Sequence, residues 1–398
     1  MRTNGPVITA WSAVSPFGIG AAPFRAGLRA GRPAVDAEVP GGPENERARL
    51  VPGFDAREVL GRKGTRSMDR VTALALTAVG RVLGPDAGGT TAADGSPRPG
   101  TGPFPDATSG GSKPTGLVLG TTTGSPQSIM DFTRDSITGE RPYLVDPARF
   151  PNTVMNCAAG RSAIRYGLRG PNATIAGGRS AGLLALKYAH RLQRNDRADT
   201  VLCGGAEEYM PVRGWLHHHS RRTGSDGAAA VPGSGGPVLG EGCAVLRLDP
   251  AGTLPDGTGL AEVAALEFGV VTGTLGIREV LASCLRRALS RTPFTADSVW
   301  AVAPCQAPGA AGVAERDALA EVLGSASPLR LACSDLIGDT AAAAATFQIA
   351  AVLALAHSSP AAVDRAALVT SVDQDGTVGC AVLRLLPGAA SHGRDTAA

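Results

Sequence analysis

A short segment in the middle of the chain has the layout of a catalytic corner but carries a side chain that cannot do the chemistry. Residues 169–208 predict a turn, a short apolar strand, the tight corner Gly-Gly-Arg-Ser at 177–180, an amphipathic helix and a second buried strand. Proteins often present a nucleophile at such a corner, because the amides and dipole of a helix N-terminus stabilise a thiolate or an oxyanion. Here the corner carries Arg179. A guanidinium cannot lose its proton in a protein, so Arg179 is neither nucleophile nor base.

The other residue types that carry chemistry form no metal or cofactor motif. The seven cysteines are scattered without a Cys-x-x-Cys pair, and several lie in apolar, strand-like segments, which favours reduced, buried thiols. Three adjacent histidines, His217, His218 and His219, project in different directions on a helix or a strand and make a poor metal site. We therefore expect no metal and no cofactor.

Composition and charge exclude several classes of partner. The 398 residues are 43% hydrophobic, and 38 basic against 35 acidic side chains leave a net charge of +3, too small to favour nucleic acid or an anionic membrane. The first residues lack the apolar core of a signal peptide, and the most apolar run, 341–356, is shorter than the roughly 20 residues that cross a bilayer. We expect a cytoplasmic globular protein in which this run is a buried helix.

Strands alternate with helices along the whole chain, and the pattern starts again at about residue 260. Alternation of this kind predicts crossovers around largely parallel, buried sheets. The repeat predicts an internally duplicated, layered α/β/α/β/α fold with one half at 1–255 and the other at 256–387. Residues 84–114, without periodicity, predict a flexible loop, and residues 388–398 a disordered tail. Residues 54–70 carry five basic side chains and predict a cationic surface segment.

Several motifs in a fixed order carry a family resemblance. The segments VITAWSAVSPFGIG, LGRKGTRSMDR, GLVLGTTTG, RGPNATIAGGRSAG, VLCGGAEE and VLGEGCAVLRLD resemble those of the β-ketoacyl-acyl-carrier-protein synthases, which have the thiolase fold. The resemblance covers essentially the whole chain. The LGRKGTR segment and the Ala-Gly-Leu after the corner look more like the type II polyketide synthase branch than the fatty acid branch.

The same resemblance implies that the catalytic residues are missing. Active members hold a Cys nucleophile at the corner, and two histidines promote decarboxylation of the extender unit and stabilise the enolate. This chain has Arg179 at the Cys position, Pro304 and Asp339 at the two His positions, and Ser334 at a Lys position. A glycine-rich gating loop is replaced by residues 372–377, Val-Asp-Gln-Asp-Gly-Thr. In this register, condensation by the family mechanism is excluded.

What remains resembles the chain-length factor, an inactive subunit that pairs with an active ketosynthase. The resemblance implies a heterodimer in which both subunits line a tunnel for the growing chain. It also implies that the acyl carrier protein binds to the complex through the partner. Side-chain volume in the tunnel then limits chain length, since overfilling a packed wall costs about 1–3 kcal/mol. By position, the candidate wall residues are Gln127, Met130, Phe132 and Trp215. Met and Phe at helical spacing are equally well explained as core residues.

Two alternatives and one electrostatic expectation stay open. The chain could be an independent acyltransferase with a site rebuilt from Arg179, Cys305 or Asp339, or a homodimeric scaffold that binds carrier proteins. An Arg beside the positive end of a helix dipole costs about 0.3–1 kcal/mol and needs a counterion. We therefore expect Arg179 to pair with Asp339. Aromatic-polyketide members usually carry Gln at the corner, so both aromatic and reduced polyene products stay open, as do the starter unit and the chain length.

Overall fold

The computed structural model describes residues 5–44, 46–84, 113–222, 237–254, 259–272 and 276–387. The predicted tail at 388–398 and all but three residues of the predicted loop at 84–114 lie outside these ranges. The strands are β1 (Val7–Ser15), β2 (Gly18–Ile19), β3 (Asp36–Glu38), β4 (Arg47–Arg49), β5 (Gly116–Thr121), β6 (Asn172–Ala176), β7 (Val201–Glu207), β8 (Leu239–Gly240), β9 (Gly242–Asp249), β10 (Ala261–Val270), β11 (Val299–Ala303), β12 (Leu329–Arg330), β13 (Ala366–Val372) and β14 (Thr377–Leu385).

Helices connect most of these strands, as the sequence predicts. The α-helices are α1 (Ala21–Ala30), α2 (Ala56–Leu60), α3 (Arg70–Leu83), α4 (Pro126–Thr138), α5 (Cys157–Tyr166), α6 (Ala181–Arg194), α7 (Pro211–Arg222), α8 (Ile277–Ser290), α9 (Gly309–Leu323), α10 (Cys333–Ile337) and α11 (Ala344–Ala356). The short 3-10 helices are η2 (Phe150–Thr153), η3 (Gly178–Ser180), η4 (Ala251–Thr253), η5 (Ala296–Ser298), η6 (Ala341–Ala343) and η7 (Pro360–Ala362).

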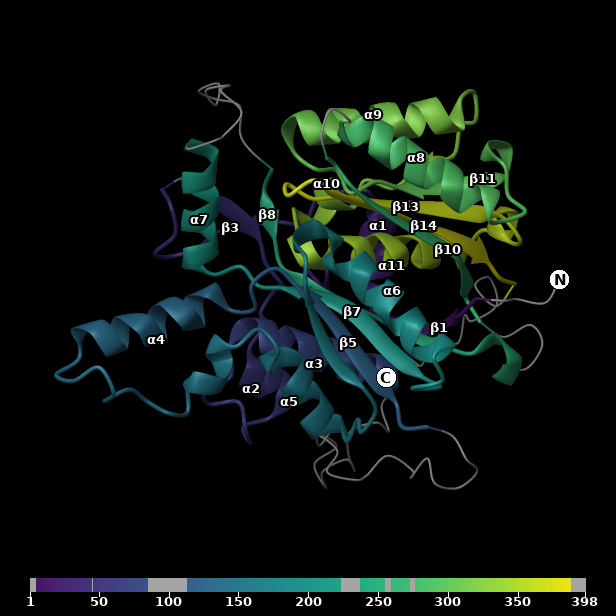
Figure 1. Ribbon diagram of the computed structural model, residues 1–398. Helices are drawn as coiled ribbons and strands as arrows, with labels where there is room; N and C mark the ends of the chain where they lie inside the picture. The colour runs from purple at the N-terminus through teal and green to yellow at the C-terminus, as the bar shows by residue number, and fades with distance from the viewer. Residues whose placement is uncertain are drawn as a thin grey trace.

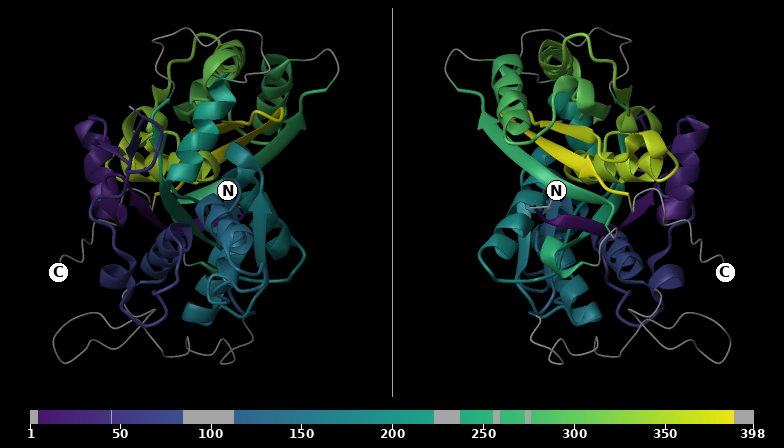
Figure 2. Two further views of the ribbon diagram at one scale, coloured as in Figure 1. Left: turned by 90° about the vertical axis from the view of Figure 1, so that its left-hand side faces the viewer. Right: turned by 90° about the vertical axis from the view of Figure 1, so that its right-hand side faces the viewer.

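The elements stack in five layers, which confirms the predicted thiolase-like α/β/α/β/α fold (Figure 1). Helices α8 and α9 form one outer layer, and α3 and α5 form the other. Between them lie two layers of strands, separated by α6 and α11 in the middle. Three apolar clusters fill the four interfaces, and the largest of them surrounds the middle helices. Figure 2 shows the same layers from both sides, with α1 flanking the middle layer.

The two layers of strands repeat one pattern. In hydrogen-bonding order they read β12-β11-β13-β14-β10 and β1-β9-β7-β5-β6, and β1 and β10 join them edge to edge. Each set therefore comes from one half of the sequence, as expected for a duplicated fold. The proposed boundary at residue 255 lies in the segment 255–258, outside the described residues.

The prediction of largely parallel sheets is wrong. Each half has two parallel pairs at its outer edge and two antiparallel pairs toward its centre. The reason is local: β14 follows β13 through a tight turn at residues 373–376, so the two strands form a hairpin, which is antiparallel by construction. Buried strands of either kind have similar apolar runs, so composition does not distinguish them.

Helix α11 shows why the middle layer can be so thin. Twelve of its thirteen residues are buried, and alanines recur on every side of the helix. A helix that is apolar all round is covered on all faces, and small side chains let both sets of strands approach its backbone. The predicted buried helix at 341–356 is thereby confirmed, with its first turn formed by η6.

Candidate functional site

The corner forms as the sequence predicts, at the junction of β6 and α6. Gly178 has a φ of 49°, in the left-handed region that favours glycine, and this lets the chain turn from the strand into η3 and then α6. Arg179 follows it and is 8% exposed. The corner thus places one permanent cation inside the protein at the start of a fourteen-residue helix.

The predicted ion pair between Arg179 and Asp339 is confirmed. Nη2 of Arg179 donates to Oδ2 of Asp339, and both side chains are buried. Burial alone would lower the pKa of Arg179, but the carboxylate of Asp339 raises it, so the guanidinium stays charged. Two residues that lie 160 positions apart in the sequence are therefore in direct contact.

Asp339 is held by more than its partner at the corner. Its Oδ1 accepts the backbone N–H of Ala341 at 3.0 Å, and Arg213 donates to its backbone carbonyl at 3.0 Å. Burial would raise the pKa of Asp339, but the charges of Arg179 and Arg213 lower it below its usual value. The carboxylate is therefore ionised and cannot act as a general acid near neutral pH.

Pro304 and Ser334, the other two residues that the resemblance places at catalytic positions, lie at the loop after β11. Pro304 is buried at the end of β11, and Ser334 donates its backbone N–H to Oε1 of Gln306 at 2.8 Å. The hydroxyl of Ser334 donates to the carbonyl of Cys305 at 3.4 Å. The ion pair therefore joins Arg179 and Asp339, whereas Ser334 contacts the residues that follow Pro304. The role of these four residues as remnants of a catalytic site is a proposal.

Cys305 is a poor nucleophile in this setting. Its side chain is buried, and burial together with the nearby carboxyl of Glu315 raises the pKa of its thiol to about 12. The thiol is therefore protonated near neutral pH, and its Sγ faces the carbonyl of Val372 at 3.7 Å. This chemistry argues against a site rebuilt around Cys305.

Reasoning from the sequence did not anticipate the carboxylates and the cation that hold this region. Glu315 accepts the backbone N–H groups of Cys305 at 2.8 Å and Gln306 at 3.0 Å, which keeps the loop after β11 in place. Arg213 reaches in from α7, and Asp373 contacts the corner from the turn after β13. No local pattern marks these residues, because each acts on a segment far away in the chain.

The four candidate wall residues lie on two helices, α4 and α7. Gln127 accepts the N–H of Val212 at 3.3 Å and lies at the root of α4, beside a groove of about 390 Å³. Met130 is half exposed, and the ring of Phe132 packs on that of Phe150, with centroids 5.9 Å apart. Trp215 is on α7, where its indole donates to the carbonyl of Gly41. No residue of α4 is fully buried, so the alternative that Met130 belongs to this chain's core is wrong.

The segment from α4 to α5 exposes an unusual amount of apolar surface. Nine of the fifteen large hydrophobic side chains that are exposed in the described part of the chain fall within residues 129–164. They are Ile129, Met130, Ile137, Tyr143, Leu144, Phe150, Val154, Met155 and Ile164. Figure 1 shows α4 extending away from the layers. Exposed apolar side chains that concentrate in one segment are a feature of interaction sites.

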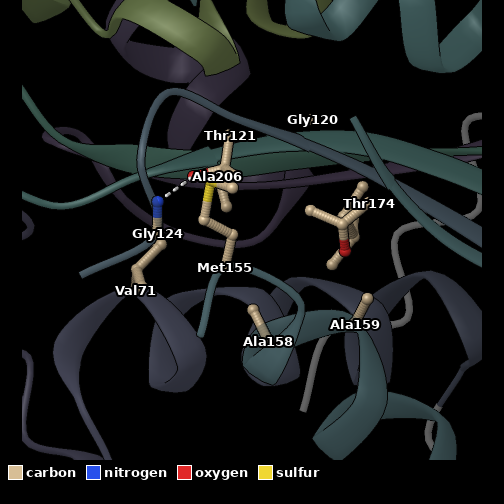
Figure 3. A pocket seen from close by; sticks show the side chains of 10 residues that line it. Val71, Gly120, Thr121, Gly124, Met155, Ala158, Ala159, Thr174 and Ala206 are labelled. Carbon is tan, nitrogen blue, oxygen red and sulfur yellow. Dashed lines mark hydrogen bonds between the residues drawn. The ribbon is translucent and has the colours of Figure 1, made fainter. Parts of the chain in front are cut away.

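A small enclosed void lies between this segment and the strands. Its volume is about 10 Å³, and the residues that bound it include Thr121, Met155 and Thr174 (Figure 3). The hydroxyl of Thr121 accepts the N–H of Gly124 at 3.0 Å, whereas the hydroxyl of Thr174 has no hydrogen-bond partner among the described residues. The void has room for about one water molecule and is far too small for an acyl chain.

The predicted cationic segment at 54–70 is confirmed except for one residue. Arg57, Arg62, Lys63 and Arg66 are exposed. Arg70 instead turns inward, where its Nε donates to the fully buried Glu241 at 2.6 Å. The segment contributes four exposed cations on and after α2.

The comparison with known families decides the relationship. Residues 6–252 match the model of the β-ketoacyl synthase N-terminal domain. The chain belongs to the β-ketoacyl synthase family. Among solved structures, one described as the ishigamide ketosynthase/chain length factor is 42% identical, with a TM-score of 0.80, and the match covers 96% of this chain and 99% of that one. A β-ketoacyl synthase from Burkholderia phymatum, 21% identical with a TM-score of 0.75, matches 97% of this chain and 100% of its own, and shows the fold alone.

Curated relatives match over a shorter stretch. The 3-oxoacyl-acyl-carrier-protein synthase 2 of Vibrio harveyi is 28% identical over 210 residues, which is 51% of this chain and 46% of that protein. The enzyme of the same name from Rhizobium meliloti is 29% identical over 211 residues, 50% of this chain and 46% of that protein. The chain thus matches somewhat under half the length of these relatives.

The described residues contain neither a membrane-spanning helix nor a cluster of metal ligands. None of the helices described is both long and apolar enough to cross a membrane. In the same ranges, His, Cys, Asp and Glu side chains form no group of three or more that could hold a metal ion.

Proposed function

We propose that this chain is a non-catalytic, chain-length-factor-like subunit of a type II polyketide synthase, which pairs with an active ketosynthase and shapes the elongation tunnel. The observation that carries the proposal is the buried ion pair of Arg179 and Asp339, which fills the two positions where family members hold a nucleophile and a histidine. The likeness to the ishigamide ketosynthase/chain length factor, at 42% identity, supports the same assignment.

The exposed apolar segment at 129–164 supports a protein partner. An interface core is enriched in aromatic residues and Met, and this segment exposes Tyr143, Phe150, Met130 and Met155. A second chain packed against this face would cover these side chains.

The free edge of β6 supports the same location. This five-residue strand ends its sheet, and its outer edge pairs with no other strand of the described chain. Unpaired N–H and C=O groups on an edge strand form a template for another chain. The edge strand at the other end, β12, has only two residues and offers little to pair with.

The void beside β5 and β6 has room for about one water molecule and does not hold an acyl chain, so we infer that a tunnel there would need walls from a second subunit. Met130 and Phe132 on α4 are the candidates that such a tunnel would use, because they lie in the exposed segment. The carrier protein would deliver its acyl chain to the partner, which holds the nucleophile. A cytoplasmic location belongs to the same proposal.

Co-expression with a Cys-bearing ketosynthase tests the pairing. We expect a stable one-to-one complex on size-exclusion chromatography, and condensation by the complex but not by this chain alone. Measurable turnover by the isolated chain would instead support a rebuilt enzyme. A stable homodimer that binds carrier protein but no ketosynthase would support the scaffold alternative.

Product length tests the tunnel. Phe132→Ala or Met130→Ala in the complex should lengthen or scatter the products seen by mass spectrometry. The smaller side chain leaves room for a longer acyl chain, which would otherwise overpack the tunnel wall at a cost of about 1–3 kcal/mol. Ile137→Ala, an equally simple truncation at the far end of α4, is the matched control and should leave the products unchanged. Unchanged products across Gln127, Met130, Phe132 and Trp215 variants would remove the tunnel assignment.

A further inference from the structure

The amide end of the corner is already occupied by a group from the other half of the molecule. Backbone N–H groups at the start of a helix bind anions, because they lack partners within the helix. Here the N–H of Arg179 donates to Oδ1 of Asp373 at 3.1 Å, across a sequence separation of 194 residues. Asp373 belongs to the turn between β13 and β14. A carboxylate from the C-terminal half of the fold thus accepts a hydrogen bond from an amide of the corner.

The shape of the corner fits this carboxylate closely. A Cβ atom added to Gly178 would lie 2.2 and 2.4 Å from the two carboxyl oxygens of Asp373. A Cβ atom at these distances would force the carboxylate of Asp373 to move, so the carboxylate occupies the space that a side chain at position 178 would need. The φ of 49° at Gly178 favours glycine for a second, independent reason. The carboxylate therefore covers the face of the corner beside the backbone.

The turn after β13 holds Asp373 in place. Its backbone N–H donates to the carbonyl of Thr377 at 2.9 Å, and its carbonyl accepts the N–H of Gly376 at 3.2 Å. Two residues before Asp373 in the same hairpin, the hydroxyl of Ser371 lies 3.0 Å from that of Ser180. Two contacts from one hairpin thus reach the corner, so the position of the carboxylate does not depend on a flexible side chain alone.

We propose that the corner is a carboxylate-binding site whose occupant is the chain's own Asp373, and that this contact closes the corner to an acyl oxyanion whatever side chain is at position 179. The guanidinium of Arg179 is bound by Asp339 and its amide by Asp373, so both cationic features of the corner are neutralised from within. The proposal goes beyond the proposed function, which depends only on the side chains at the lost positions.

A thiol placed at the corner tests the proposal directly. In the double variant Arg179→Cys/Asp339→Asn, the buried carboxylate that would lose its cation is replaced by a neutral amide, which avoids an unpaired charge. The new thiolate would displace iodide from iodoacetamide, and the labelled peptide is quantified by mass spectrometry. Adding Asp373→Asn should raise the alkylation rate at pH 7 about tenfold, because losing an adjacent negative charge lowers the thiol pKa by about one unit.

The matched control is Asp375→Asn in the same background. Asp375 is an exposed acid in the same turn, and its carboxyl accepts only the N–H of Thr377, so this variant removes the same charge without touching the corner. It should leave the alkylation rate within about twofold of the double variant. Equal rates with and without the Asp373 carboxylate, or an equal gain from the Asp375 variant, would overturn the proposal.

Hydrogen exchange gives a second test that needs no engineered thiol. In the otherwise native chain, Asp373→Ala should speed exchange of the Arg179 amide about tenfold or more, and Asp375→Ala should not. Unchanged exchange in the Asp373 variant would also overturn the proposal. Neither readout involves a partner or turnover, so this inference and the proposed function can fail separately.

Discussion

The corner and the exposed segment at 129–164 differ in whether this chain itself covers their side chains. At the corner, the charge of Arg179 and the amide beside it are matched by carboxylates from distant parts of the same chain. The segment leaves nine large apolar side chains exposed in the described part of the chain. The charges of the corner are matched within one chain, whereas the apolar side chains of the segment stay uncovered. The difference shows that distant parts of this chain satisfy the charges at the corner but do not bury the apolar surface of the segment.

Two buried carboxyl groups show that the charges of neighbouring side chains decide the direction of a pKa shift. Asp339 and Glu208 are both buried, yet the pKa of Asp339 is lowered and that of Glu208 is raised to about 8. Burial pushes both upward. Asp339 faces the cations of Arg179 and Arg213, whereas Glu208 has the carboxyls of Asp69 and Glu207 as neighbours and accepts only neutral donors, Ser125 Oγ and Val71 N–H.

The largest effect is expected from breaking the ion pair at the corner. Asp339→Ala leaves the buried guanidinium of Arg179 without its partner and should lower the free energy of unfolding by about 3–5 kcal/mol. Urea denaturation followed by circular dichroism measures it. Arg179→Met/Asp339→Leu, which removes both charges, should lose clearly less than the single variant. A single variant within about 1 kcal/mol of the natural chain would mean that the corner is open to water and unlike the closed site described above.

A smaller effect is expected from Glu208, through pH. Its folded pKa of about 8 exceeds the ordinary 4.5 of an unfolded Glu, so its contribution is fully present below about pH 4.5 and is lost as pH rises toward 8. Between pH 6 and pH 8 the natural chain should lose about 2 kcal/mol more than Glu208→Gln, whose amide does not titrate. Urea denaturation at both pH values checks this.

The control for that measurement is Glu58→Gln, which changes an exposed carboxylate on α2. Its pH dependence should match that of the natural chain. If Glu208→Gln also follows the natural chain, the carboxyl at the end of β7 is ionised in the folded state and is as well paired as Asp339.

The smallest effect is expected at the exposed segment. Ile164 on α5 is 84% exposed, so Ile164→Glu should not affect folding of the isolated chain. In the complex with a ketosynthase it should weaken association about tenfold or more, because the new charge would lose its hydration at the interface. Val313→Glu, on the opposite outer layer in α9, is the matched control. Equal affinities for both variants would place the interface elsewhere.

Much of the fold follows from local sequence patterns. Helix α3 and strand β5 carry local signals of their type, because α3 has an apolar periodicity and the capping residue Asp69, and β5 is a short apolar run. The pairing of Arg179 with Asp339 was also predictable, since a buried guanidinium needs a counterion and the resemblance put an acid at the facing position.

Other features depended on contacts that no local pattern records. The wall candidates Gln127, Met130 and Phe132 were chosen by the position of their helix in the resemblance, with Trp215 as a fourth. Position in the sequence does not tell whether a helix packs on its own core, and the exposure of Met130 shows that this residue does not join the core. Arg213 and Glu315 escaped notice because an isolated charged residue in a helix looks like any solvated side chain until the fold brings a carbonyl or an amide to it.

By itself, the sequence determined the order of the elements and the duplication, because these depend on side-chain type and on neighbours a few residues away. Only the tertiary structure decided that the sheets are mixed, that Asp373 rather than solvent meets the amide of the corner, and that α4 stands exposed. Those outcomes depend on which distant segments share a surface, and burial then sets how strongly each contact acts on charge and stability.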